Sequence, residues 1–139
     1  MKIAIVYRSF LGTTKKYATW LHESLDADLF RAGQMSKKKL RDYDLIIICS
    51  GTYMGWISLR GYLGKRWEAL QDKKVILLVV GLAPEEQVDS VIAYEKIPEH
   101  IREHIKYFKV PGTIGSGNVE NVKKENLQPV LDYINSLAT

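Results

Sequence analysis

Three short, continuous apolar runs constrain the fold more than any other feature of this chain. Residues 2–7, 44–50 and 74–80 are each rich in Ile, Leu and Val and show no alternation with polar residues. Such runs are typical of strands that are buried on both faces of a parallel sheet. Two shorter strands are expected at residues 27–31 and 106–110. The pattern therefore predicts five strands in one parallel sheet.

Between these runs, apolar residues recur at helical spacing. One helical segment begins after residue 14, a second covers residues 59–70, and a third covers residues 127–137. A short helix or turn is expected at residues 37–42, and Pro98 suits the start of another helix. Strands that alternate with helices predict an open, doubly wound α/β sheet with helices on both faces. Ligands of such sheets bind beyond the carboxyl ends of the strands.

The composition excludes several classes of protein. The 139 residues fit one domain, residues 1–139, and 46% of them are apolar, which argues against disorder. Cys49 is the single cysteine, so no internal disulfide forms and a cytoplasmic location is expected. No apolar run reaches the roughly 20 residues of a membrane span, and no signal-peptide pattern is present. The net charge of +4 favours acidic partner proteins, but no basic stripe indicates nucleic-acid binding.

The turn after the first strand has the composition of a phosphate-binding loop. It reads Ser9-Phe10-Leu11-Gly12-Thr13-Thr14 and directly precedes a helical segment. Backbone N–H groups converge at a helix N-terminus, and the helix dipole favours an anion there. We expect these N–H groups and the hydroxyls of Ser9, Thr13 and Thr14 to hold a phosphate without a cationic side chain.

A second loop, rich in glycine and aromatic residues, follows the strand at residues 44–50. It reads Gly51-Thr52-Tyr53-Met54-Gly55-Trp56. Glycines let a backbone approach a flat ligand closely, and the rings of Tyr53 and Trp56 offer faces for stacking. Alternatively, both aromatic residues belong to the core, where Tyr and Trp are often mostly buried. Their place at the carboxyl edge of the sheet favours a ligand that contains a flat ring system.

Together, the two loops resemble those of the flavodoxin family. The spacing Ser9-x-x-Gly12-x-Thr14 is similar to the phosphate loop of flavodoxins, and residues 51–56 are similar to the loop that contacts the flavin ring. The resemblance covers the whole chain in element order and implies the strand order 2-1-3-4-5 and FMN as the cofactor. The chain looks most like the branch that includes the menaquinone-dependent protoporphyrinogen oxidases, also over residues 97–105.

The resemblance assigns a third loop to the site. In flavodoxins, the loop after the fourth strand supplies backbone N–H groups to the pyrimidine edge of the flavin. The corresponding residues here are Gly81, Leu82 and Ala83. A plain strand-to-helix connection is the alternative interpretation of this loop.

These observations predict an FMN-binding protein that carries electrons between redox partner proteins. An FMN-dependent oxidoreductase that acts on a porphyrinogen or a quinone is the alternative, as is a module on the same fold that binds another phosphate ligand or a protein. No residue is singled out as catalytic. Cys49 lacks the Cys-x5-Arg pattern of a phosphatase, since Gly55 is the sixth residue after it. His100 and His104 have the spacing of metal ligands, but without a third ligand we expect a solvated helix face.

Overall fold

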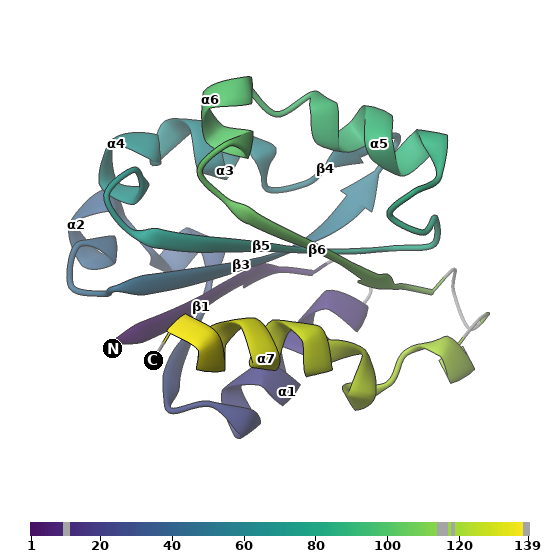
Figure 1. Ribbon diagram of the computed structural model, residues 1–139, viewed down its shortest axis with the longest axis horizontal. Helices are drawn as coiled ribbons and strands as arrows, with labels where there is room; N and C mark the ends of the chain where they lie inside the picture. Colours follow the sequence, from purple (N-terminus) through teal and green to yellow (C-terminus); the bar gives the residue numbers. More distant parts are fainter. Residues whose placement is uncertain (10–11, 114–116, 118, 138–139) are drawn as a thin grey trace.

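The central sheet contains five parallel strands. In this computed structural model, which describes residues 1–9, 12–113, 117 and 119–137, the five strands lie in the order β2-β1-β3-β5-β6 (Figure 1). Their bounds are β1 Ile3–Arg8, β2 Ala27–Arg31, β3 Leu45–Tyr53, β5 Lys74–Gly81 and β6 Lys106–Pro111. Counted along the predicted strands, this is the order 2-1-3-4-5. The expected fold class is therefore confirmed.

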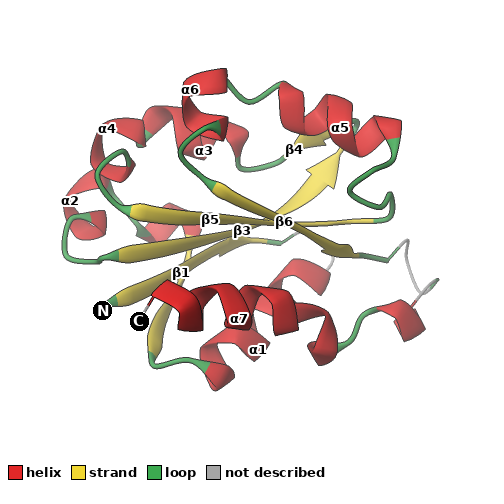
Figure 2. Cartoon of the chain, in the orientation of Figure 1, coloured by secondary structure: helices red, strands yellow, loops and turns green. Residues whose placement is uncertain are grey.

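Helices cover both faces of the sheet, as Figure 2 shows. One face carries α1 Thr13–Ser24 and α7 Gln128–Leu137, which follows a 3-10 turn at Lys124–Leu127. The other face carries α2 Lys37–Leu40, α3 Arg60–Lys65, α4 Trp67–Leu70, α5 Val88–Glu95 and α6 Glu99–Arg102. Two further 3-10 turns lie at Ala32–Gln34 and Val119–Asn121.

The continuous apolar runs supply both halves of the core. Along β1, Ile3 and Ile5 pack with α1 and α7, whereas Ala4 and Val6 pack with the helices of the opposite face. Successive side chains of a strand point to opposite faces, so a strand between two helical layers needs an apolar residue at every position. This requirement explains why the runs show no alternation.

A short hairpin extends β3 beyond the sheet. Strand β3 continues to Tyr53, and the two-residue strand β4, Trp56–Ile57, pairs antiparallel with it. The turn between them consists of Met54 and Gly55, whose φ angles of 52° and 79° are both left-handed. Two such residues form the tight hairpin turn that matches the twist of its strands. The sequence analysis expected only a loop here.

The helix expected at residues 59–70 is divided into α3 and α4. The backbone of Arg66, with φ −109° and ψ 9°, leaves the helical conformation between them. The Arg66 side chain instead reaches across the layer, where its Nε donates a hydrogen bond of 2.9 Å to the carbonyl oxygen of Met35. Gly61 and Gly64 also lower the helix propensity of this segment. None of the helices in the described ranges is both long and apolar enough to span a membrane.

Candidate functional site

A large cavity opens at the carboxyl ends of four neighbouring strands. Its volume is about 1090 Å³, slightly above the usual range for small-molecule sites. It lies at the edge where ligands of doubly wound sheets bind. The lining residues come from all three predicted loops, from α5 and from the end of β6: Ser9, Thr13, Thr14, Gly51, Thr52, Tyr53, Gly55, Val80, Gly81, Leu82, Ala83, Asp89, Ser90, Ile92, Ala93, Lys96, Lys109, Gly112 and Thr113.

The loop after β1 forms one end of this cavity. Gly12 caps α1 with a left-handed φ of 88°, a conformation that L-residues rarely adopt, and its N–H donates to Ser9 Oγ at 3.0 Å. As a glycine, Gly12 has no side chain to cap α1, and the first turn of the helix contains no acidic residue. Thr13 and Thr14 line the cavity together with Ser9. The two remaining residues predicted for this loop, Phe10 and Leu11, lie outside the described residues.

The segment at residues 51–56, which was predicted as a loop and comprises the end of β3, its turn and the start of β4, contributes only part of its residues to the cavity. Gly51, Thr52, Tyr53 and Gly55 line it. Met54 is 79% exposed and is not among the lining residues. Of this segment, the last three residues of β3 and the turn residue Gly55 therefore line the cavity.

Trp56 also does not line the cavity, and two cationic side chains contact its ring. Lys96 Nζ and Arg60 Cζ lie 3.8 Å and 3.9 Å from the ring centroid. The Lys96 ammonium also donates a hydrogen bond of 2.9 Å to the carbonyl oxygen of Gly55. These contacts fasten the hairpin turn to the C-terminal end of α5. Neither the core nor the cavity contains the Trp56 ring, which is 40% exposed.

The end of β5 and the loop after it form the neighbouring wall, with Gly81, Leu82 and Ala83 all lining the cavity. At Gly81 a Cβ would lie 2.9 Å from Thr52 Oγ1, so this wall is close to the end of β3. The carbonyl oxygen of Ala83 accepts a hydrogen bond of 2.9 Å from Ser90 Oγ. This bond ties the loop to α5.

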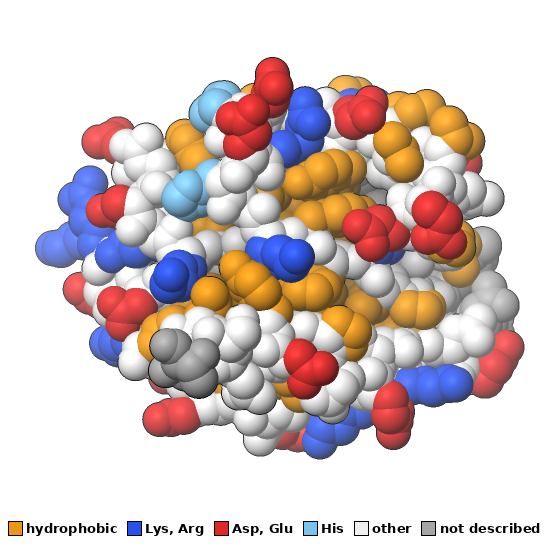
Figure 3. Space-filling view, viewed as in Figure 1, with side chains coloured by type: hydrophobic (Ala, Val, Ile, Leu, Met, Phe, Trp, Pro, Cys, Tyr) orange, Lys and Arg blue, Asp and Glu red, His pale blue; other side chains and the backbone are white. Residues whose placement is uncertain are grey.

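The sequence analysis missed the contribution of α5 and β6. The cavity residues of α5 include small ones, Ser90 and Ala93, which are buried at helical spacing and let the helix approach the sheet. Its larger apolar residues, Val88, Val91 and Ile92, are exposed instead, and Figure 3 shows apolar side chains gathered over this helix. Lys109, which lies between Phe108 and Val110 in β6, was a signal that could have been recognised.

At the end of the cavity formed by the loop after β1, a residue that follows the edge strand β6 completes the wall. The hydroxyls of Thr13 and Thr113 form a hydrogen bond of 2.9 Å, although the two residues are 100 positions apart in sequence. Nearby, the Tyr17 hydroxyl donates to the carbonyl oxygen of Pro111 at 2.7 Å and accepts from Asn126 Nδ2 at 3.0 Å. These bonds hold the end of β6 against α1.

Most of the chain matches one known protein family. Residues 4–131 match the family described as "Flavodoxin domain". The chain belongs to this flavodoxin-domain family. No curated protein sequence matches it.

Solved structures share the fold of this flavodoxin domain. A flavodoxin from the domain Archaea is 16% identical, with complete coverage of both chains and a TM-score of 0.64. Flavodoxin 2 from Bacillus cereus is 23% identical over 97% of this chain and 99% of its own, with a TM-score of 0.63. A flavoprotein from Lactobacillus acidophilus, solved in complex with FMN, is 16% identical over 79% of this chain and 91% of its own, with a TM-score of 0.55.

The cysteine considered as a nucleophile and the histidines considered as metal ligands lie outside the cavity of the flavodoxin domain. Cys49 is fully buried, and burial raises the pKa of its thiol to about 12. His100 and His104 both meet the ring of Trp67 edge-on, and His104 Nε2 lies 2.7 Å from the carbonyl oxygen of Lys73. Within the described residues, no group of three potential metal ligands occurs.

Proposed function

We propose that this flavodoxin domain binds FMN and carries electrons between redox partner proteins. The observation that carries the proposal is that one cavity joins the hydroxyl-lined start of α1 to the slot between the loops after β3 and β5. A phosphate alone would fill a small part of about 1090 Å³. The membership of the flavodoxin-domain family and the FMN complex of the flavoprotein from Lactobacillus acidophilus support this choice of ligand.

The chemistry of the cavity fits the two ends of FMN. Ser9, Thr13 and Thr14 provide neutral hydroxyl donors beside a helix N-terminus that has no acidic residue in its first turn. This set suits a phosphate, since donors can approach it without opposing charge. Between the other two loops, Tyr53, Leu82 and Ile92 provide apolar surface of the kind that accommodates a flat ring.

In this proposal, the two ends of the cavity and the exposed side of α5 have different roles. The residues of the α1 end bind the phosphate, and those of the loops after β3 and β5 orient the ring and exclude water from it. When bound, FMN supplies the reversible uptake and release of electrons. The exposed apolar side of α5, at the mouth of the cavity, provides a contact surface for a redox partner.

Titration with FMN tests the first half of the proposal. The unmodified protein is expected to quench FMN fluorescence on binding with a Kd in the micromolar range or below. Thr14→Val replaces a nearly buried hydroxyl in the cavity with a methyl group. Because a hydrogen bond to a charged group contributes about 1.5–3 kcal/mol, we expect at least tenfold weaker binding.

The matched control is Thr19→Val, the same change on the same helix but outside the cavity lining. It should leave the Kd unchanged. Failure of the unmodified protein to bind FMN would refute the proposal outright. Equal losses in both variants would mean that the α1 end does not hold the phosphate.

Electron transfer is tested with the FMN-loaded protein. After reduction with dithionite and removal of the excess, the protein should pass its electrons to cytochrome c in stopped-flow mixing. The oxidoreductase alternative stays a prediction and is measured with the same preparation. Turnover of protoporphyrinogen with a quinone as acceptor would favour that alternative over a carrier.

A further inference from the structure

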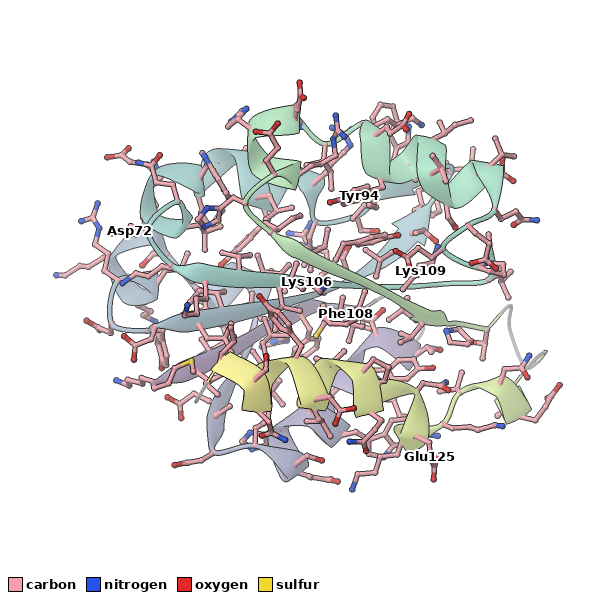
Figure 4. The ribbon with its side chains drawn as sticks, in the orientation of Figure 1. Asp72, Tyr94, Lys106, Phe108, Lys109 and Glu125 are labelled. Carbon is pink, nitrogen blue, oxygen red and sulfur yellow. The ribbon has the colours of Figure 1, made fainter. Side chains whose placement is uncertain are left out.

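One cavity residue has a charge that the fold itself does not require. Lys109 projects from β6 toward α5 and lines the cavity, as Figure 4 shows. Its side chain is half-buried, and burial lowers the pKa of its ammonium below the ordinary value of 10.5, while the nearby Glu85 carboxylate opposes this shift. Burial of a charge is unfavourable unless a partner compensates it. An ammonium in this position therefore indicates a ligand whose electron-rich atoms accept hydrogen bonds from it.

The contacts of Lys109 leave part of its hydrogen-bonding capacity free. Among the described residues it makes one hydrogen bond, in which Nζ donates to Ser90 Oγ at 2.8 Å. Ser90 in turn donates to the carbonyl oxygen of Ala83, so its oxygen is oriented to accept from the ammonium. A lysine ammonium has three N–H donors. Two of them are available to a ligand in the cavity.

The other cavity lysine is engaged differently. Lys96 Nζ already donates to the carbonyl oxygen of Gly55 and lies 3.8 Å from the centroid of the Trp56 ring. Its charge is thus directed at the hairpin. Lys109 is the cation of the described lining that can face a ligand directly.

Lys109 also lies beside the end of β5. A Cβ at Gly81 would lie 3.3 Å from Lys109 Nζ and 2.9 Å from Thr52 Oγ1. The ammonium is therefore at the part of the cavity formed by the ends of β3 and β5, to which the proposed function assigns the ring. The hydroxyls at the start of α1 are left to hold the phosphate.

We propose that Lys109 contacts the electron-rich end of the FMN ring and raises the reduction potential of the bound cofactor. This inference rests on the proposed function. Reduction by two electrons and one proton, with dithionite as the electron donor, leaves one negative charge on the ring, and the ammonium keeps its own proton throughout. A charge-assisted contact to Lys109 is stronger in that state than in the uncharged oxidised state. Lys109 is therefore a residue that tunes the cofactor.

The experiment compares Lys109→Met with Lys106→Met. Both changes remove one positive charge from the same strand, but Lys106 is exposed and does not line the cavity. The Kd of oxidised FMN and the two-electron midpoint potential are measured for each protein. For Lys109→Met we expect at most a threefold change for oxidised FMN and a further tenfold loss for reduced FMN. That loss corresponds to a fall of about 30 mV in midpoint potential.

Lys109→Arg retains the charge. The ratio of its Kd values for oxidised and reduced FMN should therefore stay within a few-fold of the ratio for the unmodified protein. Circular dichroism checks that each variant is folded, and Lys109→Gln serves as the neutral variant if Lys109→Met does not fold. Equal shifts for residues 106 and 109 would overturn the inference while leaving FMN binding intact. An equal loss of affinity for oxidised and reduced FMN in Lys109→Met would also overturn the inference. Absence of FMN binding by the unmodified protein would overturn the inference and the proposed function together.

Discussion

Replacing Gly112 with alanine tests how closely the end of β6 must approach β5. The Gly112 N–H donates a hydrogen bond of 3.0 Å to the carbonyl oxygen of Gly81. A Cβ at Gly112 would lie 3.2 Å from both Cα and N of Gly81 and 3.3 Å from Val80 Cγ1, inside the 3.4 Å at which ordinary contact begins. Two of these atoms belong to the backbone of an internal strand. Relief therefore requires the end of β6 to move.

The expected loss of stability follows from two opposing effects. Overpacking of a tight site costs about 1–3 kcal/mol. Alanine also has less conformational freedom than glycine in the unfolded chain, which stabilises the folded protein by about 0.4–1 kcal/mol. We expect Gly112→Ala to lower the free energy of unfolding by about 1–2 kcal/mol. With an m-value of about 2 kcal/mol/M, the urea midpoint falls by about 0.5–1 M.

Urea unfolding followed by circular dichroism measures this loss, with Gly33→Ala as the matched control. A Cβ at Gly33 would meet no heavy atom within 4 Å, and its φ is not left-handed. The control should therefore be as stable as the unmodified protein or slightly more stable. If both variants unfold at the same urea concentration, the close approach of β5 and β6 does not limit the side chain at position 112, and the reasoning fails.

Three further changes probe other parts of the fold. Gly64→Ala, at an exposed position of α3 with open space around it, should stabilise the protein by about 0.5–1 kcal/mol and raise the Tm in thermal unfolding, whereas an unchanged Tm would contradict this. The buried Cys49 thiol, with its pKa raised to about 12, should react with DTNB at pH 8 only after unfolding in urea, so rapid labelling of the folded protein would count against its burial. Burial raises the pKa of Tyr62 to about 12 from 10.0, so its neutral form stabilises the fold up to about pH 10 and this contribution is lost as the pH rises toward 12. Tyr62→Phe should flatten that dependence of the urea midpoint, and an equal slope in both proteins would argue against it.

The sheet could be predicted because burial on two faces leaves a direct mark on the sequence. Ile46 and Ile48 pack on one face of β3, whereas Leu45 and Ile47 pack on the other. No alternation can therefore appear in such a strand. The hairpin of β4 leaves no comparable mark, because its turn depends on the left-handed conformation of Met54, which is uncommon for a residue with a side chain.

The cavity was predictable at its loops and not along its helix. Glycines and hydroxyls near strand ends are local signals, and most of those selected do line the cavity. The wall formed by α5 depends on which side of the helix meets the sheet. Val91 is exposed and Ile92 borders the open cavity, whereas the small residues Ser90 and Ala93 pack inward. Lys109 faces the cavity through its packing against this helix, which spacing alone cannot reveal.

The hydrogen-bonded pair of Thr13 and Thr113 can orient the donors of the proposed phosphate site. Each hydroxyl can donate or accept, so the 2.9 Å bond between them can run either way. A hydrogen-bond acceptor beside Thr13 selects one orientation, in which Thr113 donates to Thr13 and Thr13 donates to the acceptor. Hydrogen bonds arranged in such a chain polarise and strengthen one another. The Thr113 side chain, 100 residues away in the sequence, can thereby strengthen the binding of an anion by Thr13.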